Sequence, residues 1–301
     1  MLKFVKYQGL GNDFLVVDLR GLSPSIHPEQ EDAWGFSIAR ALCDRRLGVG
    51  GDGVLTLTKA MTSEAAAMMR VLNSDGSEAE MCGNGLRCVV KFLLESEGKQ
   101  ATEITVDTGA GPLACTGFWQ DGQVADVEVN MGTPRLQRRD IPMSGAPNKE
   151  CLEVDYSVGE RKLSLTAVSM GNPHAIAFVP EAGAKLRTLA EAIGPTLETH
   201  IDFPQRTNVE LAKIHSSSEI ELVVWERGVG ITQACGTGAC ATVVAACRAG
   251  HCKPGTEVEV RLLGGSLFIV VSPDYQSVLM RGPATHVYAG TIDLSTLTTS
   301  A

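Results

Sequence analysis

The sequence lacks several features that would point to particular classes of protein. No apolar run approaches the length of a membrane span, and the first residues have neither the positive start nor the long apolar core of a signal peptide. Positive charge is scarce: the net charge is −9 and the pI is near 5.2, which argues against the broad basic surface that nucleic acids or anionic membranes require. We therefore expect a cytoplasmic protein that binds neither nucleic acid nor membrane.

Disulfide and zinc patterns are missing as well. The number of cysteines is odd, no CxxC pair occurs, and the spacings between neighbouring cysteines fit no common zinc motif. Together with the missing export signal, this usage predicts reduced thiols and no structural metal. The nine cysteines are Cys43, Cys82, Cys88, Cys115, Cys151, Cys235, Cys240, Cys247 and Cys252.

What the chain does have is length and an ordinary globular composition. Its 301 residues are enough for two domains, each with its own core, and 44% of them are hydrophobic and 20% charged. Strands are expected at Leu2–Tyr7, Phe14–Asp18 and Met68–Leu72, with helices over Gln30–Cys43 and Ala184–Ile193. The segment Thr133–Asn148, rich in proline and charge, is predicted to be a surface connection between two halves.

The segment NSDGSEAEMCGNGLR, from Asn73 to Arg87, places Cys82 in a glycine-asparagine-glycine turn. The residues that follow, LRCVVKFLLESEG, carry apolar side chains at helical spacing, so the turn should lie at the N-terminus of a helix. Backbone N–H groups and the helix dipole at such an end favour a thiolate and can hold an anion. Taken alone, the pattern also fits a structural cysteine beside an ordinary turn.

The Cys82 motif has a counterpart in the second half of the chain. MCGNGLRCVVKFL is echoed by ACGTGACATVVAA, which puts Cys82 and Cys235 153 residues apart. TEITVDTGAGPL is echoed by TEVEVRLLGGSL at 154 residues, VEVNMGTP by VLMRGPA at 151, and the Gly-Asn pair at Gly11 by one at Gly171, at 160. Offsets this similar predict two related α/β domains that face each other.

Two thiols at facing helix N-termini suggest the inversion of a carbon stereocentre. One thiol, as thiolate, would remove a proton, and the other would deliver a proton from the far side. The backbone amides of Gly83, Asn84, Gly236 and Thr237 would bind the substrate's α-carboxylate, more strongly as carbanion character develops. Because an unperturbed thiol, with a pKa of ~8.5, is mostly protonated at neutral pH, we expect one thiol with a lowered pKa and one without.

Further polar residues are candidates for the same site. Asn73 and Glu226 each lie nine residues before a motif cysteine. Arg227 can grip a second carboxylate bidentately and Glu226 can hold an ammonium, although the two could also form a surface ion pair. Three asparagines, Asn12, Asn172 and Asn208, are expected in turns, where turn chemistry explains asparagine without any ligand, and His174 could be structural.

The motifs NSDGSEAEMCGNGLRC, MGNPHAIAF, ERGVGITQACGTGAC and GLGNDF together resemble the diaminopimelate epimerase family, over nearly the whole chain. The resemblance implies an isomerase that interconverts LL-2,6-diaminopimelate and meso-2,6-diaminopimelate without pyridoxal phosphate or any other cofactor, on the way to lysine and peptidoglycan. It implies that Cys82 and Cys235 are the acid/base pair, with Cys82 the base toward the LL isomer, and that His174 and Glu226 assist. The residues implied to bind substrate are Asn12, Asn73, Gly83, Asn84, Asn172, Asn208, Glu226, Arg227, Gly236 and Thr237.

The resemblance also implies a fold. It is α/β (α+β), with two pseudo-symmetric domains of mixed, largely antiparallel strands, each wrapped round a central helix. The N-terminal domain would comprise residues 1–132 and about 281–301, the C-terminal domain residues 133–280, and the active site would lie in the cleft between them. Many family members are dimers, so the resemblance suggests a homodimer.

Two departures and three alternatives stay open at this stage. Many family members carry a substrate-contacting glutamine where this chain has Gly53, and Ile231 replaces an acidic residue before the second cysteine motif. The nearest alternative is another cofactor-independent racemase, acting on proline, hydroxyproline or histidine, which the Glu226-Arg227 pair disfavours. A thiol redox protein is disfavoured by the missing CxxC. A non-catalytic amino-acid-binding module would not need two thiols.

Overall fold

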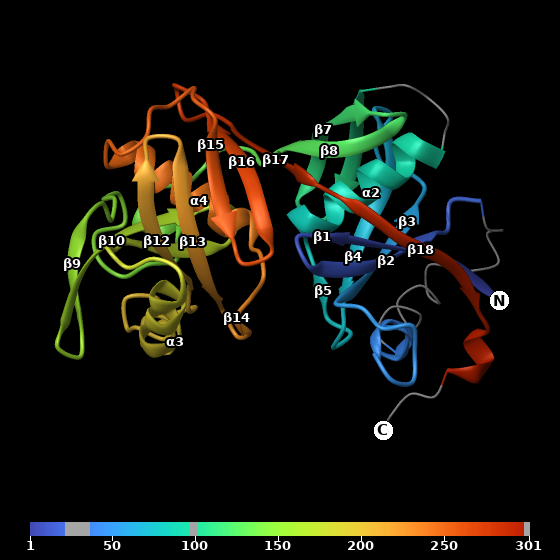
Figure 1. The fold of residues 1–301 in the computed structure, drawn as a ribbon, viewed down its shortest axis with the longest axis horizontal. Coiled ribbons are helices and arrows are strands. Elements are labelled where there is room, and N and C mark those ends of the chain that lie inside the picture. The colour runs from blue at the N-terminus through green and yellow to red at the C-terminus, as the bar shows by residue number, and fades with distance from the viewer. Residues whose placement is uncertain (22–36, 97–101, 298–301) are drawn as a thin grey trace. The chain divides into compact units, whose positions relative to one another are not determined.

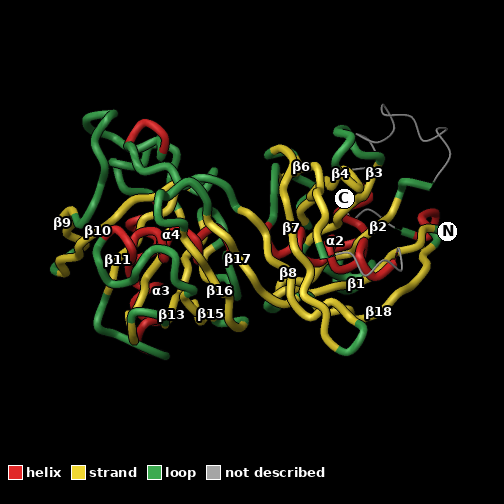
Figure 2. The backbone as a smooth tube through the Cα atoms, turned by 90° about the horizontal axis from the view of Figure 1, so that it is seen from above, coloured by secondary structure: helices red, strands yellow, loops and turns green. Residues whose placement is uncertain are grey.

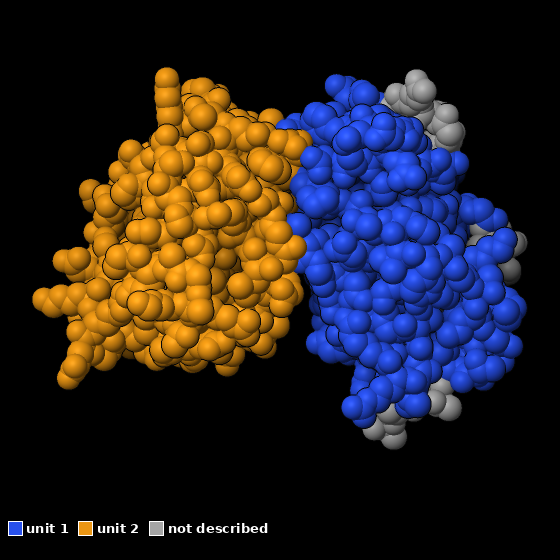
Figure 3. Space-filling view, in the orientation of Figure 1, with its two compact units in different colours: residues 1–129, 282–301 blue, residues 130–281 orange. Residues whose placement is uncertain are grey.

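The computed structural model describes residues 1–21, 37–96 and 102–297. The chain divides into two compact units, coloured separately in Figure 3: unit 1 is Met1–Val129 with Gly282–Ala301, and unit 2 is Asn130–Arg281. The C-terminal segment therefore belongs to the unit in which the chain begins. Among the helices in the described ranges, none has the length and apolar character that crossing a membrane requires.

Unit 1 is built from strands that surround one long helix (Figure 1). Most neighbouring strands are antiparallel, and the pairs β2·β3 and β4·β6 are parallel. The elements are β1 (Leu2–Gly9), β2 (Asn12–Asp18), β3 (Gly53–Thr58), β4 (Ala65–Asn73), β5 (Glu78–Ala79), α2 (Gly83–Ser96), β6 (Glu103–Thr108), β7 (Gly111–Gln120), β8 (Gln123–Asn130), β18 (Thr285–Ile292) and the short 3-10 helix η2 (Leu294–Thr296).

Unit 2 repeats this arrangement, and its helix α3 follows the strand β11 as the helical residues 37–43 follow β2 in unit 1. Its parallel pairs are β11·β12 and β13·β15, in the same places along the order of elements. The elements are the 3-10 helix η1 (Arg138–Asp140), β9 (Val154–Val158), β10 (Arg161–Ser169), β11 (Pro173–Phe178), α3 (Ala184–Glu198), β12 (Asn208–Ser216), β13 (Glu219–Glu226), β14 (Gly230–Ile231), α4 (Gly236–Arg248), β15 (Val258–Leu262), β16 (Gly265–Val271) and β17 (Val278–Pro283), whose last two residues belong to unit 1.

The correspondence between the units extends to their edge strands. In unit 1, β18 pairs antiparallel with β1, Leu2 lying opposite Ile292. In unit 2, β9 pairs antiparallel with β10, the counterpart of β1. One edge strand thus comes from the C-terminal end of the chain and the other from the segment that precedes β10.

Each unit holds its central helix among the strands, as the red tubes α2 and α4 in Figure 2 show. In α2 the first turn is buried as well as the apolar stripe, and α4 is buried from Gly236 to Cys247 except at Thr237. Alanine, glycine, cysteine and valine fill most of α4, which lets the surrounding strands approach closely. Both predicted helix starts lie at the motif cysteines, so the N-termini of these two helices carry the candidate chemistry.

The other predicted helices are confirmed in part. Residues 37–43 are helical and pack Leu42 and Cys43 into the core of unit 1, while the predicted start at Gln30 lies outside the described residues. Helix α3 continues past the predicted end to Glu198, although Pro195 lies inside it. Its last turns pack tightly: a Cβ at Gly194 would lie 2.6 Å from Cγ of Trp225, so this position has room only for glycine.

The prediction that Thr133–Asn148 connects the halves is wrong, although most of the segment is exposed or half-buried, as a surface segment should be. The whole segment belongs to unit 2, and the chain crosses between the units just before it, after Val129. Ile141 is fully buried and Met143 nearly so, and both pack into the hydrophobic core beneath α3. These two buried side chains attach the segment to unit 2. The charged residues around them made their burial hard to predict from the sequence.

Candidate active site

Cys82 caps the N-terminus of α2. Its carbonyl accepts the first helical hydrogen bond, from the N–H of Leu86 at 2.8 Å, and its Sγ accepts from the N–H of Gly85 at 3.4 Å. The thiol is half-buried. A Cβ at position 85 would lie 2.9 Å from Cδ2 of Leu55, so glycine lets the first turn pack closely against that side chain. The turn thus aims a backbone N–H at sulfur, which is the arrangement that favours a thiolate.

Amide side chains and a guanidinium lie beside this turn. The side-chain oxygen of Asn84 accepts from Nη2 of Arg87 at 2.9 Å, and Nδ2 of Asn84 donates to Oδ1 of Asn12 at 3.5 Å. Arg87 is fully buried, and its Nε also donates to the carbonyl of Pro283 at 3.1 Å. Nδ2 of Asn12 donates in turn to Oδ2 of Asp52 at 2.7 Å.

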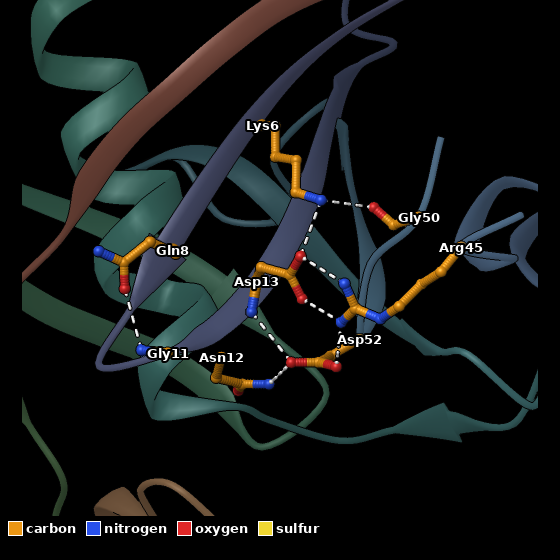
Figure 4. Close-up of polar contacts among 8 residues, drawn as sticks. All are labelled: Lys6, Gln8, Gly11, Asn12, Asp13, Arg45, Gly50 and Asp52. Carbon is orange, nitrogen blue, oxygen red and sulfur yellow. Dashed lines mark hydrogen bonds and ion pairs between the residues drawn. The ribbon is translucent and has the colours of Figure 1, made fainter. Parts of the chain in front are cut away.

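Asp52 belongs to a charged cluster that orients Asn12 (Figure 4). Arg45 donates to Asp13 at 2.6 Å and to Asp52 at 2.8 Å, and Nζ of Lys6 lies 2.7 Å from Asp13. Burial alone would raise the pKa of Asp13, but the hydrogen bonds and charges of Arg45 and Lys6 lower it to about 2. The cluster holds the amide of Asn12 in one orientation, with Nδ2 on the carboxylate and Oδ1 toward Asn84.

Asn73 ends β4, and a neighbouring backbone contact ties it to the same cluster. Its Nδ2 donates to Oγ of Ser77 at 2.9 Å, and the N–H of Ser74 donates to the carbonyl of Asp52 at 3.1 Å. Gly53 lies opposite Asn73 in the β3·β4 register. A Cβ at Gly53 would lie 2.8 Å from the carbonyl oxygen of Leu72, so this backbone has no room for a side chain at that position.

Cys235 caps α4 in the same way. The N–H of Ala239 donates to its carbonyl at 3.0 Å, and the N–H of Gly238 donates to its Sγ at 3.4 Å. The Oγ1 of Thr237 also lies 3.4 Å from the sulfur. Unlike Cys82, this thiol is buried, with 7% of its surface exposed. A Cβ at Gly238 would lie 2.8 Å from Oε1 of Glu210, which brings a carboxyl group to the first turn of the helix.

Burial, together with two nearby acidic groups, sets the protonation of Cys235. Burial raises the pKa of its thiol well above the ordinary value, the charges of Glu226 and Glu210 raise it further, and the hydrogen bonds from Thr237 and Gly238 act against this. Glu226 itself accepts from Oγ1 of Thr232 at 2.5 Å, and burial raises its pKa as well. Cys235 is therefore a protonated thiol at neutral pH.

His174 lies in the same part of unit 2, fully buried. Its Nδ1 contacts Oε1 of Glu210 at 2.6 Å and its Nε2 contacts Oδ1 of Asn172 at 2.9 Å. Glu210 was not among the sequence-predicted site residues. The sequence does contain a feature that could have identified it: a single acidic residue in the strand NVELA, whose flanking apolar residues indicate burial. A buried carboxyl group needs a partner.

Asn208 and Arg227 lie on neighbouring strand ends. Oδ1 of Asn208 accepts from the backbone N–H of Arg227 at 2.9 Å, and its Nδ2 donates to the carbonyl of Pro173 at 3.0 Å. The side chain of Arg227 is exposed, and its Nη1 donates to the carbonyl of Gln205 at 3.0 Å. Through this hydrogen bond Asn208 fixes the backbone of the loop that carries the Arg227 guanidinium.

The predicted site residues form one group in each unit. In unit 1 the group is Asn12, Asn73, Cys82, Gly83 and Asn84; in unit 2 it is Asn172, His174, Asn208, Glu226, Arg227, Cys235, Gly236 and Thr237.

No metal site is found among the described parts of the chain. They contain no cluster of three or more histidine, cysteine or acidic side chains arranged to hold a metal ion.

Comparison with known proteins decides the family. The model of the diaminopimelate epimerase family matches residues 4–137 and 166–287, which include both cysteine-capped helices. The chain belongs to the diaminopimelate epimerase family. The resemblance drawn from the sequence is confirmed, and so is the predicted enzyme class, an isomerase that acts on amino acids.

Relatives within the family match along nearly their full length. The diaminopimelate epimerase of Thermosynechococcus vestitus is 45% identical over 299 residues, covering 97% of this chain and 99% of that protein. Those of Pelotomaculum thermopropionicum and Agathobacter rectalis are 44% and 41% identical, covering 96% and 97% of this chain and 98% and 100% of those proteins.

Solved structures show that the epimerase fold is shared more widely. A probable proline racemase from Agrobacterium radiobacter superposes with a TM-score of 0.69 at 16% identity, covering 98% of this chain and 93% of that chain. A hydroxyproline epimerase from Agrobacterium vitis gives 0.69 at 18% identity, with 97% and 90% covered. The predicted fold class, α/β with mixed, largely antiparallel strands around central helices, is confirmed.

Proposed function

We propose that this epimerase interconverts LL-2,6-diaminopimelate and meso-2,6-diaminopimelate with Cys82 and Cys235 as its two acid/base groups, and without a cofactor. The observation that carries the proposal is the matched pair of cysteine-capped helices, in which Gly85 and Gly238 each donate a backbone N–H to sulfur at 3.4 Å. Membership of the family supports diaminopimelate as the substrate.

The direction of proton transfer follows from the protonation of Cys235. Starting from the LL isomer, the thiolate of Cys82 removes the α-proton, and the electron pair left on carbon is delocalised into the α-carboxylate. The thiol of Cys235 then delivers its proton to the opposite face, and the stereocentre inverts. The raised pKa of Cys235 supports its role as the donor in this direction. The mechanism requires both sulfurs to reach opposite faces of one carbon.

The helix N-termini supply the charge stabilisation that the carbanion needs. The backbone amides of Gly83, Asn84, Gly236 and Thr237 bind the reacting carboxylate, and losing one such donor typically costs ~10²–10³ in rate. Glu226 holds an ammonium group and, with His174, adjusts the protonation of the thiols.

The remaining contacts recognise the rest of the substrate. The exposed guanidinium of Arg227 is suited to bidentate binding of the second carboxylate. The other residues that we propose to contact diaminopimelate are Asn12, Asn73, Asn172 and Asn208.

An isotope experiment tests the two-thiol mechanism. The full-length enzyme is incubated with LL-diaminopimelate in deuterated water, and deuterium is expected at the α-position of the meso product. Cys82→Ala and Cys235→Ala should each lower the rate by roughly 10³-fold or more, since each removes an acid/base group. A Cys235→Ala enzyme that epimerised at the parent rate would refute the mechanism, and proline and hydroxyproline serve as control substrates that should not exchange.

We also propose a cytoplasmic location and a homodimer. All nine cysteines are thiols, which suits a reducing compartment. Measuring the mass of the purified protein in solution tests the dimer, and fractionation of cells that make the protein tests its location.

A further inference from the structure

Two buried contacts determine how many protons His174 and Glu210 hold. The side-chain oxygen of Asn172 can only accept, so Nε2 of His174, at 2.9 Å, carries a hydrogen. On the other side of the ring, the 2.6 Å contact between Nδ1 and Oε1 of Glu210 requires one more hydrogen between the two atoms. The pair is therefore either imidazolium with carboxylate, or imidazole with carboxylic acid.

The second oxygen of Glu210 distinguishes the two forms. His174 and Glu210 are both fully buried, and within the described residues Oε2 of Glu210 has no hydrogen-bond partner. A carboxylate spreads its charge over both oxygens, and burying one of them without a donor is costly. A carboxylic acid that donates through Oε1 leaves only a carbonyl-like oxygen at Oε2, which tolerates the apolar surroundings better.

The neighbouring groups favour the same form. Glu210 faces His174 on β11, Glu226 on β13 and Cys235 at the start of α4. A carboxylate at Glu210 would repel a negative charge on Glu226, and it would disfavour the thiolate that Cys235 becomes after giving up its proton. Burial raises the pKa of Glu210 and outweighs three opposing contributions: the charge of His174, its hydrogen bond, and a hydrogen bond from the backbone N–H of Ala175.

We propose that Glu210 is a protonated carboxylic acid in the resting enzyme, that it donates its proton to Nδ1 of a neutral His174, and that it is a positioning residue for the reaction. The ring then keeps its Nε2–H on Asn172 and fixes the amide of that substrate-binding residue. The pair adds no negative charge beside Cys235 when this thiol gives up its proton. The role in the reaction rests on the proposed function, whereas the protonation state does not.

Spectroscopy of the full-length enzyme without substrate tests the protonation state. In protein labelled with ¹⁵N-histidine, near neutral pH, His174 is expected to show a protonated Nε2 and an unprotonated, hydrogen-bonded Nδ1. The infrared spectrum should contain a protonated-carboxyl band that Glu210→Gln removes. Two protonated ring nitrogens, or no change in the carboxyl region, would overturn the proposal. Neither measurement uses diaminopimelate, so their outcome is independent of the proposed reaction.

Activity of two variants tests the positioning role. In Glu210→Gln the amide NH₂ replaces the acid O–H as donor to Nδ1, so kcat should stay within about tenfold of the parent, with an unchanged pH profile. Glu210→Leu removes the donor and should lower kcat by roughly 10²-fold with a shifted pH profile. A Glu210→Gln enzyme as impaired as Glu210→Leu would overturn the role. If Glu210→Leu does not fold, the Glu210→Gln profile alone decides.

Discussion

In unit 1, Cys82 is half-buried beside amide side chains and a buried guanidinium, whereas in unit 2, Cys235 is buried beside two carboxyl groups. The backbone around the two sulfurs is the same, with one N–H donor at 3.4 Å in each turn. The repeat thus preserves the cap geometry and changes the charge around it. A two-base reaction needs this asymmetry, because one group must start as base and the other as acid.

The fifth residue after each cysteine shows how the two helices differ. Arg87 occupies this position in α2 and Cys240 in α4, and both side chains are fully buried. Arg87 donates to the carbonyls of Gly83 and Pro283 and to the side chain of Asn84. Helix α2 therefore has a buried cation in its first turns, whereas α4 has a small thiol at the matching position.

Removing the buried cation should have the largest effect on stability. Arg87→Met deletes the charged donor to the Pro283 carbonyl and to the side chain of Asn84, so we expect a loss of about 3 kcal/mol in the free energy of unfolding. Cys240→Ala, at the matching position of α4, truncates a small buried side chain and should cost about 1 kcal/mol. Urea unfolding of the two variants measures both values. Equal losses would mean that the guanidinium has no special structural role in unit 1.

Cys82 and Cys235 should also differ in how fast they react with an alkylating reagent. Cys82 is the one cysteine of the nine that is not buried. At pH 7 it should react with iodoacetamide at least about tenfold faster than Cys235, whose raised pKa keeps it protonated. Because the thiolate is the reactive form, the rate at Cys235 should rise as the pH rises toward its folded pKa. Peptide mass spectrometry of timed samples measures both rates.

Removing the carboxyl group of Glu226 should narrow the difference in alkylation rate between Cys82 and Cys235. The charge of Glu226 raises the pKa of Cys235, so Glu226→Gln should lower that pKa and increase the alkylation rate of Cys235 several-fold at pH 7. Cys115, buried in unit 1, is the internal control and should react as slowly in the variant as in the parent. An unchanged rate at Cys235 would show that burial alone keeps this thiol protonated.

The comparison also shows what could be predicted from the sequence. The helix after Cys82 follows from apolar spacing that begins directly after a glycine turn, and the repeat at 153 residues places Gly85 and Gly238 at the same step of their helices. These patterns are local or periodic. They therefore indicate helix starts and related units without any knowledge of tertiary contacts.

Residues whose role depends on long-range burial could not be predicted in this way. Arg87 looks like a solvent-facing residue of an amphipathic helix, and only the packing of β1, β2 and the Pro283 carbonyl shows that it is enclosed. Glu210 looks like one polar residue in a strand until His174 on the neighbouring strand is in place. Ile141 and Met143 lie among charged residues, so their burial beneath α3 was concealed.

The smallest expected effect concerns the charged cluster that holds Asn12 on the Cys82 side. Asp13 has a folded pKa of about 2, below its ordinary 3.8, so its ionised form stabilises the fold at pH values above about 4 and the contribution is lost as the pH falls toward 2. Arg45 is largely exposed, with 58% of its side chain accessible, so solvent screening reduces the contribution to about 1 kcal/mol. Asp13→Asn should therefore be about 1 kcal/mol less stable than the parent at pH 7.

The pH dependence of that difference is the decisive measurement. The unfolding free energies of the parent and Asp13→Asn should converge between pH 4 and pH 2, since the parent loses its advantage when Asp13 is protonated. Glu191→Gln, which removes the exposed Arg187–Glu191 pair on α3, is the matched control and should change stability by less than about 0.5 kcal/mol at any pH. A constant gap for Asp13→Asn down to pH 2 would show that the cluster stabilises unit 1 through the shape of its hydrogen bonds. In that case the charge asymmetry between the two cysteine turns would not extend to the residues that support Asn12.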